Sequence, residues 1–206
     1  MLENVTFSVA PGETLGIVGR NGSGKSTLLK ILAGILKPDS GSVTSRADKI
    51  SLMTLQLGFD NLLSGRDNAV FGGMLLGFSR QEVEAKLDQI QSFSGLGRAF
   101  YAPVKSYSSG MSSRLKFAVA INLAPDIMLL DEVLAVGDMS FRKKAAAAMH
   151  SKINSDQTTI LVTHNPGEVQ KLCDRAILLE GGKIMAEGHP DEVIDQYQSL
   201  LEATMN

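Results

Sequence analysis

The chain has 206 residues, of which 44% are hydrophobic and 20% are charged, as in ordinary globular proteins. This length suits one well-filled core with a smaller attached subdomain. A net charge of −2 without a basic stripe argues against a nucleic-acid partner, and no apolar run approaches the roughly 18 residues of a membrane span. No secretory signal pattern follows Met1, and the single cysteine, Cys173, excludes an internal disulfide.

The first 38 residues indicate the start of an α/β unit. Apolar and polar residues alternate over 5–9, which is the period of a half-buried strand. After a turn at Pro11-Gly12, the apolar run 14–18 predicts a buried strand. A glycine-rich loop follows, and apolar residues at helical spacing over 28–36 predict a helix that ends before Pro38. Strand, loop and helix in this order favour an α/β fold.

The rest of the chain predicts a helical insert inside the α/β core. Strands are expected at 42–44, 49–53, 127–130 and 159–162, with a hairpin of 176–179 and 183–186 around a Gly-Gly turn. Between about 60 and 125 the pattern is mostly helical, and Ser79 with Glu82 has the spacing of a capping box. An amphipathic helix is expected from Asp191. We predict one domain, with 1–59 and 126–206 as its α/β core and about 60–125 as its helical insert.

A phosphate-binding loop is the most specific motif. The segment fits the pattern G-x-x-x-x-G-K-[ST] in full, with Gly19, Arg20, Asn21, Gly22, Ser23, Gly24, Lys25, Ser26 and Thr27. Glycines let the backbone curl so that its N–H groups face an anion, and the next helix directs its N-terminus at the same anion. We expect Lys25 to reach the outer phosphates of ATP and the Ser26 hydroxyl to bind Mg²⁺. An accidental glycine-rich turn is the alternative, which the flanking strand and helix disfavour.

Two adjacent carboxylates, Asp131 and Glu132, end the apolar strand at 127–130. In a parallel sheet this end opens onto the ligand crevice, so Asp131 is expected to act on Mg²⁺ and Glu132 to orient and deprotonate the attacking water. A solvated strand end is the alternative. His164 closes the apolar strand at 159–162 and is a candidate donor to the γ-phosphate; a lone histidine at such a place is more often structural.

A fourth segment leads to a family. Residues 107–111, Tyr-Ser-Ser-Gly-Met, with Arg114 after them, open a predicted helix at 112–123. Together with the motifs above, this segment resembles the signature of ABC ATPases, usually written LSGGQ; Ser108 and Gly110 match it, whereas Ser109 and Met111 depart from it. The resemblance implies a P-loop NTPase core of RecA-like type with a mostly parallel sheet, an antiparallel β subsheet and a helical subdomain. The family's first strand and its adenine-stacking aromatic residue would lie upstream of Met1.

In ABC ATPases the signature of one copy covers the γ-phosphate held by the other. The resemblance therefore implies a homodimer that sandwiches ATP with Mg²⁺ and hydrolyses it. It also makes Asp138 the D-loop aspartate and His164 the switch histidine. Gln56 is the only glutamine near the family's Q-loop position, where it would reach Mg²⁺; an exposed loop residue is the equal alternative.

The amino-acid sequence around the motifs resembles that of the ATP-binding subunits that export O-antigen, capsule or teichoic acid in bacteria. Asp-Glu-Val-Leu-Ala-Val-Gly-Asp at 131–138 and the sequence at 58–68 carry this resemblance. It implies an integral membrane permease as partner, with Phe71, Met74 and Leu75 as candidate contacts, at the cytoplasmic face of the bacterial cell membrane. A non-transport ABC ATPase and a truncated nucleotide-binding regulator without turnover are the alternatives.

Overall fold

A computed structural model of the chain describes residues 1–53, 58–123, 125–131, 138–153, 155 and 157–205. The residues group into two compact units. The first contains Met1–Leu52, Asp126–Glu132 and Lys152–Asn206, and the second contains Met53–Pro125 and Val133–Ser151. Each unit is described by itself below.

The first unit is built on one mixed sheet. Its strands are β1 (Thr14–Val18), β2 (Ile50–Met53), β3 (Ile127–Asp131), β4 (Thr158–Val162), β5 (Arg175–Glu180) and β6 (Lys183–Gly188). They lie in the order β2-β3-β4-β1-β5-β6; β1 is parallel to both of its neighbours, β3 is parallel to β4, and β5 pairs with β6 in antiparallel fashion. Since β1, β3, β4 and β5 run the same way, their carboxyl ends meet at one edge of the sheet, where ligands of open α/β sheets bind.

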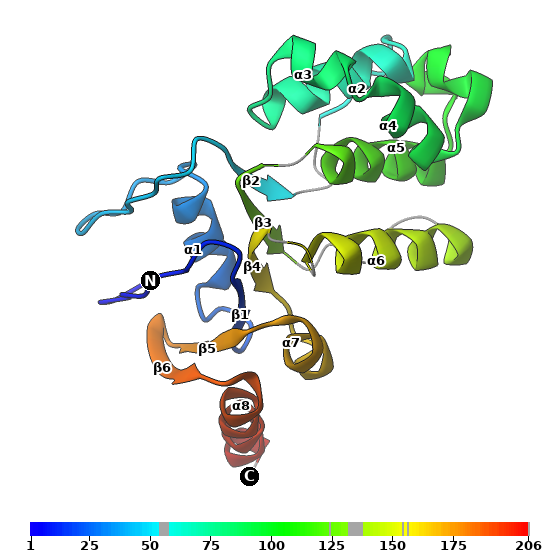
Figure 1. The fold of residues 1–206 in the computed structure, drawn as a ribbon. Coiled ribbons are helices and arrows are strands. Elements are labelled where there is room, and N and C mark those ends of the chain that lie inside the picture. Colours follow the sequence, from blue (N-terminus) through cyan, green and yellow to red (C-terminus); the bar gives the residue numbers. More distant parts are fainter. Residues whose placement is uncertain (54–57, 124, 132–137, 154, 156, 206) are drawn as a thin grey trace. The chain divides into compact units, whose positions relative to one another are not determined.

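Helices cover the two faces of this sheet. Helix α1 (Lys25–Leu32) packs on one face through Leu28 and Leu29, which share a cluster with Ile17 of β1. On the other face, Val18 shares a cluster with residues of α7 (Pro166–Leu172) and α8 (Pro190–Met205). Figure 1 shows α1 and the pair α7 and α8 on opposite sides of β1 and β5. All five residues of β1 are buried, as the apolar run 14–18 predicts.

The second unit is helical. It contains α2 (Gly65–Leu75), α3 (Arg80–Glu84), α4 (Leu87–Ser94), the 3-10 turns η1 (Gly97–Tyr101) and η2 (Val104–Ser106), α5 (Ser109–Asn122) and most of α6 (Met139–Ile153). Both halves of the predicted capping box are present at the start of α3, between Ser79 and Glu82. Three aromatic rings, Phe93, Phe117 and Phe141, hold α4, α5 and α6 together at centroid distances of 5.8–6.0 Å.

Most of the predicted elements are confirmed, with two corrections. Residues 42–44 do not form a strand: they are exposed and pair with no neighbouring strand, so their backbone gains nothing from an extended ladder. Residues 5–9 are also not a strand, although Val5, Phe7 and Val9 are half-buried in alternation and pack on the core. The antiparallel part of the fold is the β5–β6 pair at the edge of the same sheet, and its turn uses positive φ at Gly181 and Gly182.

A side-chain network holds the segment before β1. Arg175 of β5 donates to the Glu13 carboxylate at 2.7 Å, contacts Glu187 of β6, and donates to the Ser8 carbonyl. Burial alone would raise the pKa of Glu13, but the bonds from Arg175 and from the Ala10 N–H, with the charge of Arg175, lower it overall. The alternating segment 5–9 is therefore anchored at its end without strand pairing.

Candidate functional site

The loop between β1 and α1 is shaped by its glycines. Gly19 approaches β5 so closely that a Cβ atom there would lie 2.0 Å from the Leu179 carbonyl oxygen. Gly24 caps α1 with a φ of 106°, a conformation that side chains other than glycine rarely adopt. A side chain at either position would force the loop to open. This backbone therefore requires glycine at positions 19 and 24.

A cavity of about 480 Å³ opens beside the loop, and it draws its lining from two strand ends. It is lined by Asn21, Gly22, Gly24, Lys25, Ser26, Thr27 and Asp131. All except Asp131 follow β1, and Asp131 is the last residue of β3. The structure thus brings together the two motifs that the sequence predicts on different strands, across more than 100 residues of sequence.

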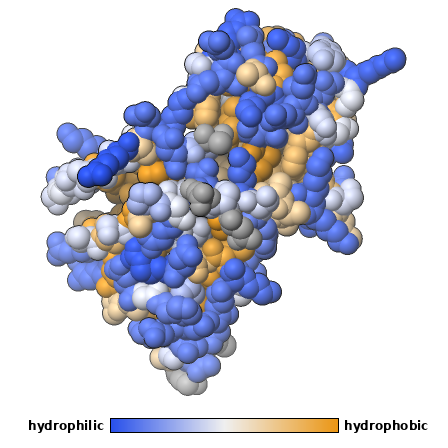
Figure 2. Space-filling view, in the orientation of Figure 1, coloured by the Kyte–Doolittle hydropathy of each residue, from blue (hydrophilic) through white to orange (hydrophobic). Residues whose placement is uncertain are grey.

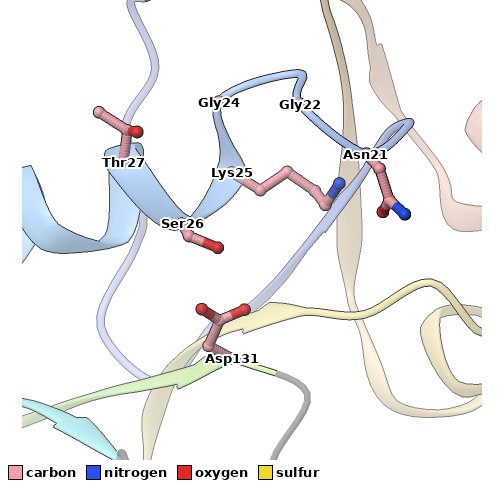
Figure 3. Close-up of a pocket in the computed structure, with 7 residues that line it drawn as sticks. All are labelled: Asn21, Gly22, Gly24, Lys25, Ser26, Thr27 and Asp131. Carbon is pink, nitrogen blue, oxygen red and sulfur yellow. The ribbon is translucent and has the colours of Figure 1, made fainter.

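Lys25 is the charged residue of the loop that lines the cavity. Its side chain is only 9% exposed, and its ammonium donates to the carbonyls of Gly19 at 2.7 Å and Arg20 at 2.8 Å. These bonds fold the lysine back over the start of the loop (Figure 3). A buried ammonium next to backbone N–H groups at a helix start forms a site that attracts phosphate oxygens.

Ser26 and Asp131 form an oxygen-rich side of the cavity. In Figure 3 the Ser26 hydroxyl and the Asp131 carboxylate point toward one another from α1 and β3. A hydroxyl and one carboxylate, completed by phosphate oxygens and water, are the hard oxygen donors that Mg²⁺ prefers. The donor set therefore fits magnesium, as predicted from the sequence. In the described part of the chain no group of three or more His, Cys, Asp or Glu residues could hold a metal by itself.

Three residues of the motif do not line the cavity. Gly19 is buried, and Arg20 lies 3.8 Å from Glu180 at the end of β5. Ser23 is 4% exposed, and its hydroxyl bonds to no other described residue. That these three residues bind ATP stays a prediction.

Of the remaining predicted catalytic and metal-binding residues, His164 is the one that the structure describes. His164 lies two residues beyond β4, at the same edge of the sheet as Asp131, and is exposed; it is not among the residues that line the cavity. Glu132 and Gln56 lie outside the described residues. Their roles remain predictions.

The signature segment lies in the second unit, where it begins α5. Ser108 caps this helix by accepting the Met111 N–H at 3.2 Å, so the helix starts three residues earlier than predicted. Ser108 and Ser109 are exposed, with Gly110 and Met111 half-buried. The start of α5 therefore carries small polar side chains that are exposed at Ser108 and Ser109.

Arg114 is a residue of α5, and Asp138 directly precedes α6. Hydrogen bonds from Ser140 and from the Phe141 N–H, with a contribution from the charge of Arg114, lower the pKa of Asp138. Asp138 also caps α6, whose Arg142 N–H bonds to its carbonyl at 2.9 Å. The Arg114 Nε is buried and bonds to no other described residue. Asp138 is thus held by hydrogen bonds at the start of α6, and its role as the D-loop aspartate stays a prediction.

Comparison with known proteins decides the family. Residues 2–135 match the family model described as "ABC transporter", which is more than half of the chain. The chain belongs to the ABC transporter family. This ABC chain is 45% identical over 205 residues to the O-antigen export system ATP-binding protein RfbB of Myxococcus xanthus, and the match covers 98% of this chain and 47% of that protein. It is 38% identical to the RfbB protein of Klebsiella pneumoniae, with 97% and 81% covered. The chain therefore spans about half the length of the first of these relatives.

The ABC fold is also confirmed by a solved structure. A dimeric post-hydrolysis state of the ATP-binding cassette MJ0796 bound to ADP and Pi matches with a TM-score of 0.70 and 25% identity, over 92% of this chain and 90% of that one. No helix in the described ranges has the length and apolar character that would let it cross a bilayer. The predicted family and fold class are confirmed by these findings.

Proposed function

We propose that this chain is the ATP-binding and ATP-hydrolysing subunit of an ABC transporter that exports a cell-surface polysaccharide. One observation carries the ATPase part: Lys25 and Ser26 of the phosphate loop line the same cavity as Asp131 of β3, and the Ser26 hydroxyl points toward the Asp131 carboxylate. Family membership supports ATP as the nucleotide. The names of the two RfbB relatives support a glycan as the exported substrate.

We assign a separate step to each group of predicted site residues. The backbone N–H groups at 21–26 bind phosphate oxygens at the N-terminus of α1, and Lys25 neutralises their charge. Ser26 and Asp131 would hold Mg²⁺, which when bound would offset the negative charge that develops on the phosphates. Glu132 takes a proton from the attacking water, and His164 donates to the γ-phosphate. Charge neutralisation and positioning together lower the barrier to phosphoryl transfer.

Replacing Asp131 by asparagine tests the metal side of this site. We expect the Mg²⁺ concentration for half-maximal ATP turnover to rise at least about tenfold, because a neutral amide oxygen is a weaker ligand than a carboxylate. Binding of a fluorescent ATP analogue in EDTA should stay within about twofold, since the phosphate loop is unchanged.

The matched control is Asp126→Asn, at the opposite end of the same strand. Asp126 accepts the N–H groups of Asp48 and Lys49 at 2.8 and 2.9 Å, which an asparagine oxygen can also do. An unchanged Mg²⁺ requirement in the Asp131 variant, or an equal shift in both variants, would refute the assignment of Asp131.

A homodimer completes the proposed site. The exposed Ser108 and Ser109 at the start of α5 suit the γ-phosphate held by a second copy, and the matched MJ0796 structure is dimeric. ATP bound between two copies favours the closed pair by its differential affinity, and its hydrolysis releases them. Opening and closing of this pair would drive the transporter.

The exposed face of α2 is the proposed contact for an integral membrane permease. Phe71, Met74 and Leu75 are 47%, 47% and 58% exposed, and a hollow of about 250 Å³ lies beside the first two, between Arg66 and Arg80. Figure 2 shows apolar surface, in orange, among polar side chains over the helices of the second unit. An exposed apolar group of this kind favours protein contact. The permease would hold the chain at the cytoplasmic face of the bacterial inner membrane.

Replacing Phe71 by glutamate tests this contact. In cells that depend on this chain, we expect surface polysaccharide to fall at least about tenfold, because docking would bury an unpaired carboxylate. ATP turnover of the purified chain should stay within about twofold, since Phe71 is remote from the phosphate loop in sequence and belongs to the other unit.

Met185→Glu is the matched control, because Met185 is 59% exposed on β6 in the first unit. Export should be normal in that variant. Normal export in the Phe71 variant, or an equal loss of export in both variants, would show that α2 is not the docking face.

A further inference from the structure

The C-terminal helix reaches the phosphate loop through one side chain. Tyr197 of α8 is 6% exposed and packs in the cluster that contains Val18 of β1 and Leu178 of β5. Its hydroxyl donates to the Gly19 carbonyl, which is the first carbonyl of the phosphate loop. The two residues are 178 positions apart in sequence, so only the fold brings them together.

Two described residues of unequal strength as donors bond to the Gly19 carbonyl. The Lys25 ammonium lies at 2.7 Å, a short charge-assisted bond, whereas the Tyr197 hydroxyl lies at 3.5 Å, which is long for an O–H donor. In this state the lysine therefore satisfies the carbonyl, and the tyrosine contributes little.

Binding of phosphate changes this balance. The loop offers Lys25 as its cation, and the phosphates draw the ammonium away from the carbonyls of Gly19 and Arg20. Arg20 is half-exposed, so its carbonyl can bind water instead, but Gly19 is buried and its carbonyl has no such replacement. A buried carbonyl without a donor disfavours the bound state.

We propose that Tyr197 is a positioning residue for nucleotide binding, whose hydroxyl takes over the Gly19 carbonyl when Lys25 moves to the phosphates. This inference rests on the proposed ATP-binding function. The tyrosine already points at the carbonyl, makes no other hydrogen bond to a described residue, and needs only to shorten an existing contact. It thereby lowers the cost of releasing the lysine without touching the nucleotide.

The surroundings of Tyr197 keep it a donor. Burial raises the pKa of the phenol, and the nearby Glu180 carboxylate raises it further, while Arg20 lowers it. The phenol therefore keeps its proton at neutral pH. Glu180 itself lies 3.8 Å from Arg20 through one oxygen, and its other oxygen is buried and accepts no hydrogen bond from a described residue.

The first test is nucleotide affinity in Tyr197→Phe, which keeps the buried ring and removes only the hydroxyl. We expect binding of a fluorescent ATP analogue to weaken about five- to tenfold, because the Gly19 carbonyl loses its replacement donor. Tyr101→Phe is the control, because Tyr101 is 60% exposed in the second unit. The affinity of this variant for the ATP analogue should change less than about twofold. Wild-type affinity in the Tyr197 variant would overturn the inference, whereas a wild-type chain that binds no nucleotide would overturn the proposed function.

The second test separates this exchange of donors from a general packing role, and it uses nucleotide-free protein. In urea unfolding followed by circular dichroism, Tyr197→Phe should change the unfolding equilibrium constant less than about threefold, because Lys25 still satisfies Gly19. In a Lys25→Ala background the same substitution should change the unfolding equilibrium constant about tenfold toward the unfolded state. In that background Tyr197 is the remaining donor to the Gly19 carbonyl among the described residues. Equal effects in the two backgrounds would reduce Tyr197 to a packing residue and refute the proposal.

Discussion

Replacing Ser108 by arginine is expected to lower ATP turnover at least about hundredfold, while ATP binding by the single chain stays within about twofold. Ser108 is exposed at the start of α5, where the proposed second copy places its γ-phosphate. A long side chain there blocks the approach of the two copies, and it leaves the phosphate loop of its own chain untouched. Turnover and fluorescent-nucleotide binding measured on the same preparation check both halves of the prediction.

The loss of the helix cap must be separated from the loss of the dimer site. Arginine cannot accept the Met111 N–H, which costs about 1 kcal/mol of helix stability, whereas Ser108→Asp keeps the cap and places a negative charge beside the phosphate. Both variants should be inactive. Ser92→Arg, at an exposed serine of α4, should remain active. An active Ser108→Asp variant would mean that this segment only caps α5.

Replacing Glu132 by glutamine is expected to trap an ATP-bound dimer that turns over at least about hundredfold more slowly, because an amide cannot take a proton from water. Glu132 follows Asp131, which ends β3 at the cavity. With hydrolysis blocked, ATP stays in place and favours the closed pair. Size-exclusion chromatography with ATP and Mg²⁺ reads out the dimer directly.

Glu202→Gln, on the exposed surface of α8, is the control and should behave like the unaltered chain. A Glu132→Gln chain that stays monomeric at saturating ATP would contradict the shared site between two copies. Fast hydrolysis by that variant would instead assign the base to another residue, with His164 as the next candidate at the same sheet edge.

Local patterns in the sequence predicted much of this fold. The strand at 14–18, the glycine loop, the capping box at Ser79 and the hairpin at 176–186 each depend on neighbouring residues, and the structure confirms them. The strands at 5–9 and 42–44 failed because a strand needs a partner across space, which no local pattern supplies. Helical spacing predicted α8 but gave no sign that one of its residues contacts the phosphate loop.

The sequence by itself determined the chemistry of the site. The spacing of residues from Gly19 to Ser26 predicts the phosphate loop, and the apolar run before Asp131 predicts that Asp131 ends a strand. Both are properties of short segments. Only the tertiary structure decided that Gly19, Arg20 and Ser23 lie outside the cavity lining, and that Tyr197 shares a carbonyl with Lys25. Which buried carbonyl has a second donor depends on how α8 packs against β1 and β5, and packing between distant segments leaves no periodic trace in sequence.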